Sequence, residues 1–366
     1  MPFLKKLIEP PSSLHLPTVG LDISDNSFKY IKLHSVNGDF RVEDFGAEKL
    51  PSGILSSGTI QNKKSLAQTL ATHFSKKSYK HVALALPEEH GFVRTIHLPK
   101  ITPEELGEAI SLQIEEHIPL SPEETSFTFR VLPQQHSRDT MDVLLVAFPT
   151  PILTAYKEVI SEAGLTPVAL EIESQAIARA VIPQSEWDKA VLVIDIGLTR
   201  TSFLFAKDGF VQHTSTVPIG GQNMHAAIAK ALTIDEKEAE RVKKEYGSMQ
   251  PQERKAVFDA LMPLIQNLKE EASRRIDFWN VEMGPHKNLG KEKTGVTHVY
   301  LCGGDANLTD LPRHLSAELN MPVNLANVWV NVFHDSSYVP EIEFRESLEY
   351  ATAIGLALGA NTNVWA

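Results

Sequence analysis

Apolar runs that end in Asp-Ile occur twice along this chain, and small polar residues follow each of them. The later run, VLVIDIGLTRTS, covers residues 191–202, and the earlier run, VGLDISDNSFK, covers residues 19–29. Such a run predicts a buried strand, and the residues after it predict a tight turn whose amides and hydroxyls can hold phosphate. Either turn alone is also typical of an ordinary hairpin. Two such turns in one chain suggest a nucleotide held between two similar halves.

A third apolar run strengthens this interpretation. The segment VYLCGGDANLTDLP covers residues 299–312, and its predicted strand runs into Gly303 and Gly304. Two residues without side chains let the backbone approach a flat ring closely. Residues 308–319 then read as a helix. A plain strand-to-helix turn is the alternative, but the order of the three elements is more specific than any one of them.

The remaining periodicity predicts a chain of alternating strands and helices around one inserted segment. Before the insertion we expect strands over 19–33 and 40–50 joined by a turn at Asn37-Gly38, a helix over 63–74 and a strand over 82–86. After it we expect the chain to return over 168–182, with helices over 235–246, 257–279 and 346–358 and a polar loop over 285–295. A short arm over 1–16 is expected to dock on the body or on a partner rather than on a membrane.

The segment from about Glu89 to Thr166 is predicted to be the insertion. We expect strands over 92–97, 126–132 and 143–148 and helices over 103–117 and 151–163, the last closing at Gly164. The first helix is well started, because Thr102 can cap it and Pro103 fits its first turn. An apolar stripe then repeats at four-residue spacing along this helix, made by Leu106, Ile110, Ile114 and Ile118.

Composition narrows the class of protein. The chain has 366 residues, of which 42% are hydrophobic and 22% charged, so it is long enough for two or more packed units. Its formal net charge of -11 argues against nucleic acid or anionic lipid as a main partner. The single Cys302 excludes an intrachain disulfide framework and favours a reducing compartment. We expect no secretory signal and no membrane span.

With its three elements in this order, the chain resembles the actin-like ATPase superfamily. Within that superfamily it is most similar to the family of the type IV pilus assembly protein PilM, and the cell-division protein FtsA is a more distant relative. The shared segments are VALALP (82–87), IHLP (96–99), TPEEL (102–106), IEEHIP (114–119), VPIGG (217–221) and AIGLAL (353–358). The resemblance covers about Val19 to Leu358.

The resemblance implies an α/β, actin-like ATPase fold, in which two mixed-sheet domains flank a nucleotide cleft and an FtsA/PilM-type α+β subdomain is inserted. It divides the chain into an arm (1–16), domain 1 (17–88 and 167–188, with 331–366 returning to it), the inserted subdomain (89–166) and domain 2 (189–330). It also implies ATP and Mg2+ as cofactors. The inserted subdomain is expected to make protein contacts rather than to do chemistry.

The resemblance assigns the phosphate end of the cleft to the two turns. Asp22 and Asp195 would hold Mg2+ through metal-bound waters, because hard carboxylate oxygens suit this ion, although each could instead cap its own turn. The phosphates would be contacted by Ser24, Asn26, Ser27, Lys29, Gly197, Thr199 and Thr201. Ser24 departs from the family pattern, which commonly has Gly there. If that turn needs a positive φ, serine costs about 1 kcal/mol or more.

The other site residues follow in the same way. Gly303 and Gly304 would lie under the adenine, while Glu240 and Lys243 would meet the ribose and base unless they simply form a solvated helix face. Asp305 replaces what is often a third glycine or serine. Glu173 stands where bacterial relatives can have a carboxylate that orients the attacking water, which hydrolysis needs and binding does not.

Three functions remain open at this stage. The first is a cytosolic ATP-binding scaffold at the inner membrane, whose partner by resemblance is the N-terminal peptide of a PilN-like membrane protein, with contacts to pilus motor ATPases and self-association also considered. The insert's helix would line that groove with Glu115, Glu116, Ile118 and Leu120. The second is an active ATPase or small-molecule kinase, and the third is an FtsA-like filament former. No convincing Ser-His-Asp or Cys-His spacing and no zinc pattern is visible, which excludes those chemistries.

Overall fold

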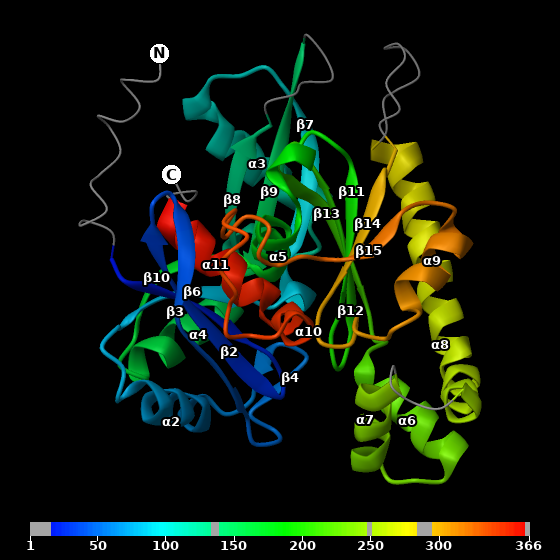
Figure 1. Cartoon of the computed structure of the whole chain (residues 1–366). Coiled ribbons are helices and arrows are strands. Elements are labelled where there is room, and N and C mark those ends of the chain that lie inside the picture. Colours follow the sequence, from blue (N-terminus) through cyan, green and yellow to red (C-terminus); the bar gives the residue numbers. More distant parts are fainter. Residues whose placement is uncertain (1–15, 133–138, 247–250, 284–294, 363–366) are drawn as a thin grey trace.

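Two mixed sheets of similar topology form the framework of the molecule (Figure 1). The computed structural model describes residues 16–132, 139–246, 251–283 and 295–362. The first sheet has the strand order β10-β6-β1-β2-β3. Its strands are β1 (Thr18–Ile23), β2 (Ser27–Val36), β3 (Asp39–Lys49), β6 (His81–Leu86) and β10 (Thr166–Ile172). The strand predicted over 19–33 is therefore two strands, because the chain turns back at residues 24–26.

The second sheet has the order β13-β12-β11-β14-β15. Its strands are β11 (Val191–Ile196), β12 (Thr201–Lys207), β13 (Phe210–Val217), β14 (His298–Cys302) and β15 (Val323–Leu325). In both sheets the central strand, β1 or β11, pairs antiparallel with the next strand in sequence and parallel with a later one on its other side. The predicted duplication of two similar halves is confirmed at the level of strand pairing.

Helices cover both faces of each sheet. Between the sheets lie α5 (Glu173–Val181) and α11 (Ala351–Thr362), which share one apolar cluster with residues from β2, β11 and β12 (Figure 1). On the far face of the first sheet pack α2 (Lys63–Phe74) and α4 (Thr150–Glu162). The far face of the second sheet is covered by α6 (Gly221–Leu232), α7 (Glu236–Glu245), α8 (Pro251–Phe278) and α9 (Leu311–Leu319). The central strands of the two sheets are thus covered on both faces.

Two glycines let α11 sit very close to its neighbours. A Cβ atom at Gly20 of β1 would collide with the backbone carbonyl of Ala353, and one at Gly355 would collide with the carbonyl of Ala176 in α5. Since only hydrogen fits at these positions, α11 packs backbone against backbone on both sides. The C-terminal helix α11 thus packs on β1 of the first sheet and on α5.

The inserted segment forms a separate three-stranded sheet, β7-β9-β8, with one helix on it. Its elements are β7 (Phe92–Pro99), α3 (Pro103–His117), β8 (Thr125–Val131) and β9 (Thr140–Pro149). The carboxylate of Glu105 accepts a hydrogen bond from the backbone N–H of Thr102 at 3.1 Å, which fixes the start of α3. The stripe of Leu106, Ile110 and Ile114 is buried in this small core, as predicted.

Short elements complete the described chain. They are β4 (Leu55–Ser56), β5 (Thr59–Ile60), η2 (Glu88–His90), η3 (Pro122–Glu124), η4 (Gln184–Glu186), η6 (Trp279–Met283), α10 (Phe344–Ser347) and η7 (Leu348–Tyr350). The predicted arm up to residue 15 and residues 285–294 of the predicted loop lie outside the described residues. Among the ranges that the structure describes, no helix combines the length and the hydropathy that crossing a membrane requires.

Candidate nucleotide cleft

The turns after β1 and β11 face one another across a cleft of about 910 Å³. Because both strands are central in their sheets and end at the same side, residues far apart in sequence meet there. The cleft is lined by most of the residues that were assigned to nucleotide binding: Asp22, Ser24, Asn26, Ser27, Lys29, Glu173, Asp195, Gly197, Thr199, Glu240, Lys243, Gly303 and Gly304. The structure therefore brings these positions to one place.

The first turn is closed by its own side chain. Ser24 donates from both its backbone N–H and its hydroxyl to the carbonyl of Ser27, at 2.9 Å each. Ser24 is not among the described residues with a positive φ, so serine carries no left-handed strain at this position. Next to it, the carboxylate of Asp25 accepts hydrogen bonds from the backbone N–H groups of Ser57 and Gly58, both at 3.0 Å. The turn is thereby tied to the β4–β5 hairpin.

The second turn is held by the start of α6. Gly197 donates its N–H to the carbonyl of Arg200 at 2.9 Å, and Gly221 and Gln222 donate theirs to the carbonyls of Gly197 and Leu198 at 3.0 and 2.8 Å. These bonds fix the loop that lines the cleft.

Thr201 requires a correction within this turn. Its side chain is fully buried, and its hydroxyl donates to the carbonyl of Ile219 at 2.6 Å. It is the first residue of β12 and points into the core, whereas Thr199 lines the cleft. Thr201 therefore holds the loop in place and is not available to a phosphate.

Two aspartates lie at the centre of the cleft, one at the end of each central strand. Burial and, second, the nearby Glu173 carboxylate together raise the pKa of Asp22 to about 7, while Lys29 opposes the shift. Burial, again followed by Glu173, raises the pKa of Asp195 to about 6. Burial and the negative charge of Glu173 thus both disfavour the ionised form of these two aspartates. A divalent cation placed here would relieve that repulsion, so the residues fit a magnesium ion.

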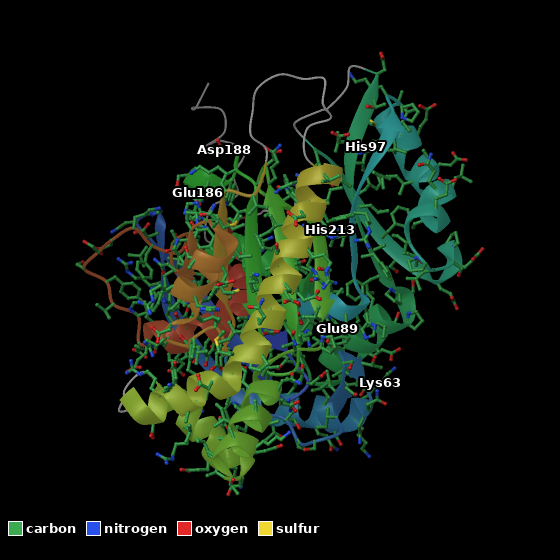
Figure 2. The ribbon with its side chains drawn as sticks, turned by 90° about the vertical axis from the view of Figure 1, so that its right-hand side faces the viewer. Lys63, Glu89, His97, Glu186, Asp188 and His213 are labelled. Atoms are coloured by element: carbon green, nitrogen blue, oxygen red, sulfur yellow. The ribbon has the colours of Figure 1, made fainter. Side chains whose placement is uncertain are left out.

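A buried arginine, Arg200, is the main residue of the cleft that the sequence analysis did not single out. Its Nη2 contacts both carboxylate oxygens of Glu173, at 3.1 and 3.0 Å, and its Nη1 contacts Glu89 Oε1 at 2.6 Å. Arg200 lies on the second turn, while Glu173 begins α5 and Glu89 belongs to η2. Figure 2 shows Glu89 below His213 and His97, at the lower end of the inserted sheet. One signal was present in the sequence, since Arg200 is the one charged residue in the turn over 197–200.

The glycine pair and a second ion pair line another part of the cleft. Gly303 has a φ of +87°, and a Cβ atom there would meet Asp195 Oδ1 at 2.5 Å, so this position requires glycine. Asp305 forms an ion pair with Lys243, and both side chains are largely buried. Glu240 pairs instead with Lys244 at 2.7 Å on the same helix. The unusual Asp305 is thus neutralised within the protein.

Among the residues assigned to a partner groove, Ile118 is placed in the core of the inserted subdomain. Ile118 is 1% exposed and Leu120 packs on the same core, so the assignment of Ile118 as a surface contact is wrong. Glu116 is exposed, and the side chain of Glu115 lies outside the described part of the chain. The stripe that includes Ile118 is used to bury α3 on its own sheet, which leaves no side chain from it for a partner.

A different cavity, of about 580 Å³, lies where the inserted sheet meets the first sheet and the β12–β13 turn. Its walls are mainly apolar and come from β8, β9, β10 and α5. They include Phe127, Phe129, Val146, Leu153, Leu170, Gln175, Arg179, Trp187 and Phe210. We call this the apolar groove. At its rim the guanidinium of Arg130 lies over the ring of Phe210, 5.2 Å from the ring centroid.

Comparison with known proteins gives a consistent picture. The family model of the type IV pilus assembly protein PilM matches residues 20–361. A solved structure described as a PilM-PilN type IV pilus biogenesis complex is 25% identical, with a TM-score of 0.77 over 95% of this chain and 99% of that one. The structure of MreB 5 of Spiroplasma citri bound to AMPPNP is 14% identical, with a TM-score of 0.53 over 96% of this chain and 97% of that one.

One curated relative is matched only in part. The cell division protein FtsA of Neisseria meningitidis serogroup B is 33% identical over 88 residues, which is 24% of this chain and 21% of that protein. The match therefore spans about a fifth of the length of FtsA. Together with the two solved structures, it confirms the actin-like ATPase fold that the three sequence elements predicted.

Proposed function

The chain belongs to the family of the type IV pilus assembly protein PilM, and we propose that it is an ATP-binding scaffold of the pilus assembly complex. In this proposal it works in the cytoplasm, at the inner membrane, which it reaches through a partner. The observation that carries the nucleotide-binding part is the convergence of Asp22, Asp195 and the glycine pair at Gly303 on one cleft. The solved relatives include MreB 5 bound to AMPPNP and a PilM-PilN complex, and both are consistent with the proposal.

Different residues of the cleft would contact different parts of a bound nucleotide. The two turns, with Gly197 and Thr199 in one and Ser27 in the other, would meet the phosphates, and Lys29 would add a positive charge. The magnesium ion would be held by Asp22 and Asp195, and it would supply charge neutralisation between them and the phosphates. Arg200 contacts both carboxylate oxygens of Glu173. Glu173 is therefore a paired carboxylate rather than a free base. This pairing favours a binding role over rapid turnover.

Calorimetry with Mg2+ and ATP tests this part of the proposal. We expect the wild-type protein to bind ATP and the Asp195→Ala variant to lose at least about tenfold in affinity, because the cation loses a carboxylate. Asp188→Ala is the matched control, since Asp188 is an exposed aspartate seven positions earlier and is labelled away from Glu89 in Figure 2. Equal affinities of the two variants would count against the cleft as the binding site.

For the partner, we propose that the N-terminal peptide of a PilN-like protein binds in the apolar groove. The groove is mainly apolar and built jointly by the inserted sheet and the first sheet, which suits a peptide with apolar side chains. It also replaces the α3 surface as the candidate site, since Ile118 is buried. The inserted subdomain, residues 89–166, would then be the module that contributes the partner contacts.

A pair of substitutions on one strand tests the groove. Leu170→Glu places a charge among the lining residues of the groove, whereas Val168→Glu places it on the same strand at an exposed position. We expect Leu170→Glu to weaken binding of a PilN N-terminal peptide by tenfold or more and Val168→Glu to leave it unchanged. Comparable affinities of the two folded variants would remove the groove from the proposal. An active ATPase or a filament former of the FtsA type remains the alternative function.

A further inference from the structure

The guanidinium of Arg200 occupies a position between the two halves of the cleft. The residue belongs to the turn between β11 and β12, yet both of its carboxylate partners, Glu89 and Glu173, come from segments attached to the first sheet. The side chain is 15% exposed and still lines the cleft. Arg200 therefore bridges the two halves while facing the space in which the phosphates would lie.

In the proposed function this part of the cleft holds the phosphates. Lys243 of α7 pairs with Asp305, whereas Arg200 contacts Glu89 and Glu173. The charges of Glu173, Glu89 and Asp195 act on Arg200, and that of Arg200 acts on Asp22. Of the three nucleotide phosphates, the one farthest from the base would come closest to Arg200.

We propose that Arg200 is the residue that distinguishes a nucleoside triphosphate from a diphosphate in this cleft, by exchanging Glu89 for the terminal phosphate. The inference rests on the proposed nucleotide-binding function. A guanidinium offers planar, forked donors that match a phosphate as well as they match a carboxylate. In the structure Nη1 and Nη2 of Arg200 both contact carboxylates, so the terminal phosphate takes the place of one of them. The exchange moves no covalent bond.

Glu89 is the partner that is suited to leave. It receives a single contact from Arg200, whereas Glu173 receives two. Its other oxygen, Oε2, is buried without a hydrogen-bond partner among the residues that the structure describes. Burial, with Glu173 as the second cause, also raises the pKa of Glu89 to about 7. The carboxyl can therefore take up a proton near neutral pH when Arg200 leaves it, which avoids a buried unpaired charge.

The exchange also links the cleft to the insertion. Glu89 lies in η2, directly before β7, the first strand of the inserted sheet. Breaking its contact with Arg200 removes an ion pair between the second turn and that segment. Binding of a nucleoside triphosphate would thus break a contact at the start of the inserted subdomain, whereas a diphosphate would leave that contact intact.

The test compares the affinities for ADP and for a non-hydrolysable ATP analogue, both with Mg2+, by calorimetry. Arg200→Gln should weaken binding of the ATP analogue by about tenfold or more and change ADP binding by less than about threefold. Glu89→Gln imitates the protonated carboxyl and frees Arg200 in advance, so it should tighten binding of the analogue relative to ADP. Arg313→Gln, which makes the same charge change at an exposed arginine outside both cavities, should leave both affinities unaltered.

The affinity for the ATP analogue is expected to fall in Arg200→Gln and to rise in Glu89→Gln, which distinguishes this role from a structural one. Damage to the fold by Arg200→Gln lowers both affinities together, and it cannot explain a gain in Glu89→Gln. Wild-type binding with the same ratio of affinities in all variants would overturn the role of Arg200 and leave the proposed function standing. Absence of nucleotide binding by the wild-type protein would overturn both.

Discussion

The backbone of Gly303 lies directly against the carboxylate of Asp195. Gly303 directly follows β14, and Asp195 is the last but one residue of the neighbouring parallel strand β11. A Cβ atom at Gly303 would stand 2.5 Å from Asp195 Oδ1 and from the carbonyl oxygen of Ile196. The glycine of one motif and the aspartate of another are therefore parts of a single contact. A substitution at either residue should therefore disturb the position of the other.

Gly303→Ala is expected to destabilise the protein through two separable effects. The φ of +87° costs an alanine about 1–2 kcal/mol, and the collision with Asp195 adds roughly 1–3 kcal/mol of overpacking. Gly53→Ala isolates the first effect, because Gly53 has a φ of +83° and nothing within 4 Å of the added Cβ. Urea unfolding of both variants measures the difference. If they lose the same stability, the contact with Asp195 has no energetic weight.

The stability of the protein without ligand should depend on pH through Asp22. Its pKa is raised in the folded state from 3.8 to about 7, so the folded protein holds a proton that the unfolded chain releases. Stability therefore falls as the pH rises between these values, by at most about 1.4 kcal/mol per pH unit for this group. Asp22→Asn should abolish that part of the slope and make the protein more stable than wild type at pH 8.

Urea unfolding at pH 5 and pH 8 checks this expectation. Asp188→Asn serves as the control, because the same chemical change at an exposed aspartate should leave the pH dependence as it is in the wild type. Parallel pH profiles for wild type and Asp22→Asn would show that Asp22 is ionised in the folded protein throughout this range.

The two threonines of the second turn should show opposite phenotypes. Thr201→Val removes the hydroxyl that donates to Ile219 at 2.6 Å, which should cost roughly 1–3 kcal/mol of stability because the bond is buried. Thr199→Val should change stability by less than about 0.5 kcal/mol and should weaken nucleotide binding instead. Urea unfolding measures the stability of both variants, and calorimetry measures their affinity for the nucleotide. A stability loss in Thr199→Val would reverse the assignment.

Removal of Lys243 should be costly, because it leaves the carboxylate of Asp305 largely buried without its cation. We expect Lys243→Met to lose about 3 kcal/mol of stability and the double variant with Asp305→Asn to recover part of it. The next residue supplies a matched control. Lys244 pairs with Glu240 on the surface, so Lys244→Met should cost no more than about 1 kcal/mol. Equal losses at the two lysines would mean that the buried pair contributes no more than the surface one.

Local signals predicted the elements well, while side-chain partners across the cleft were harder to predict. The helix over 103–117 was predicted to its last residue, because Thr102, Pro103 and a four-residue apolar period all act within one segment. The contact of Arg200 with Glu89 joins residues that only the pairing of distant strands brings together, and no local pattern encodes it. The same limit applies to the pairing of Lys243 with Asp305.

Two errors concern the direction in which a side chain points. Ile118 continues the stripe of Leu106, Ile110 and Ile114, and that regular spacing was itself a sign of burial rather than of a partner surface. Thr201 follows the turn and opens a strand, so alternation along β12 decides whether it faces the cleft or the core. The start of that strand had to be known to the residue, and boundaries are what a sequence pattern defines least well.

The close fit of α11 has a consequence for how the protein is made. The helix fills the space between β1 and α5 with backbone-to-backbone contacts at Gly20 and Gly355, and it is the last element of the described chain to leave the ribosome (Figure 1). Until then the apolar inner face of the first sheet has no cover from it. A nascent chain in this state presents a surface that chaperones bind and that aggregates readily. Slow or truncated synthesis should therefore harm this protein more than its folded stability suggests.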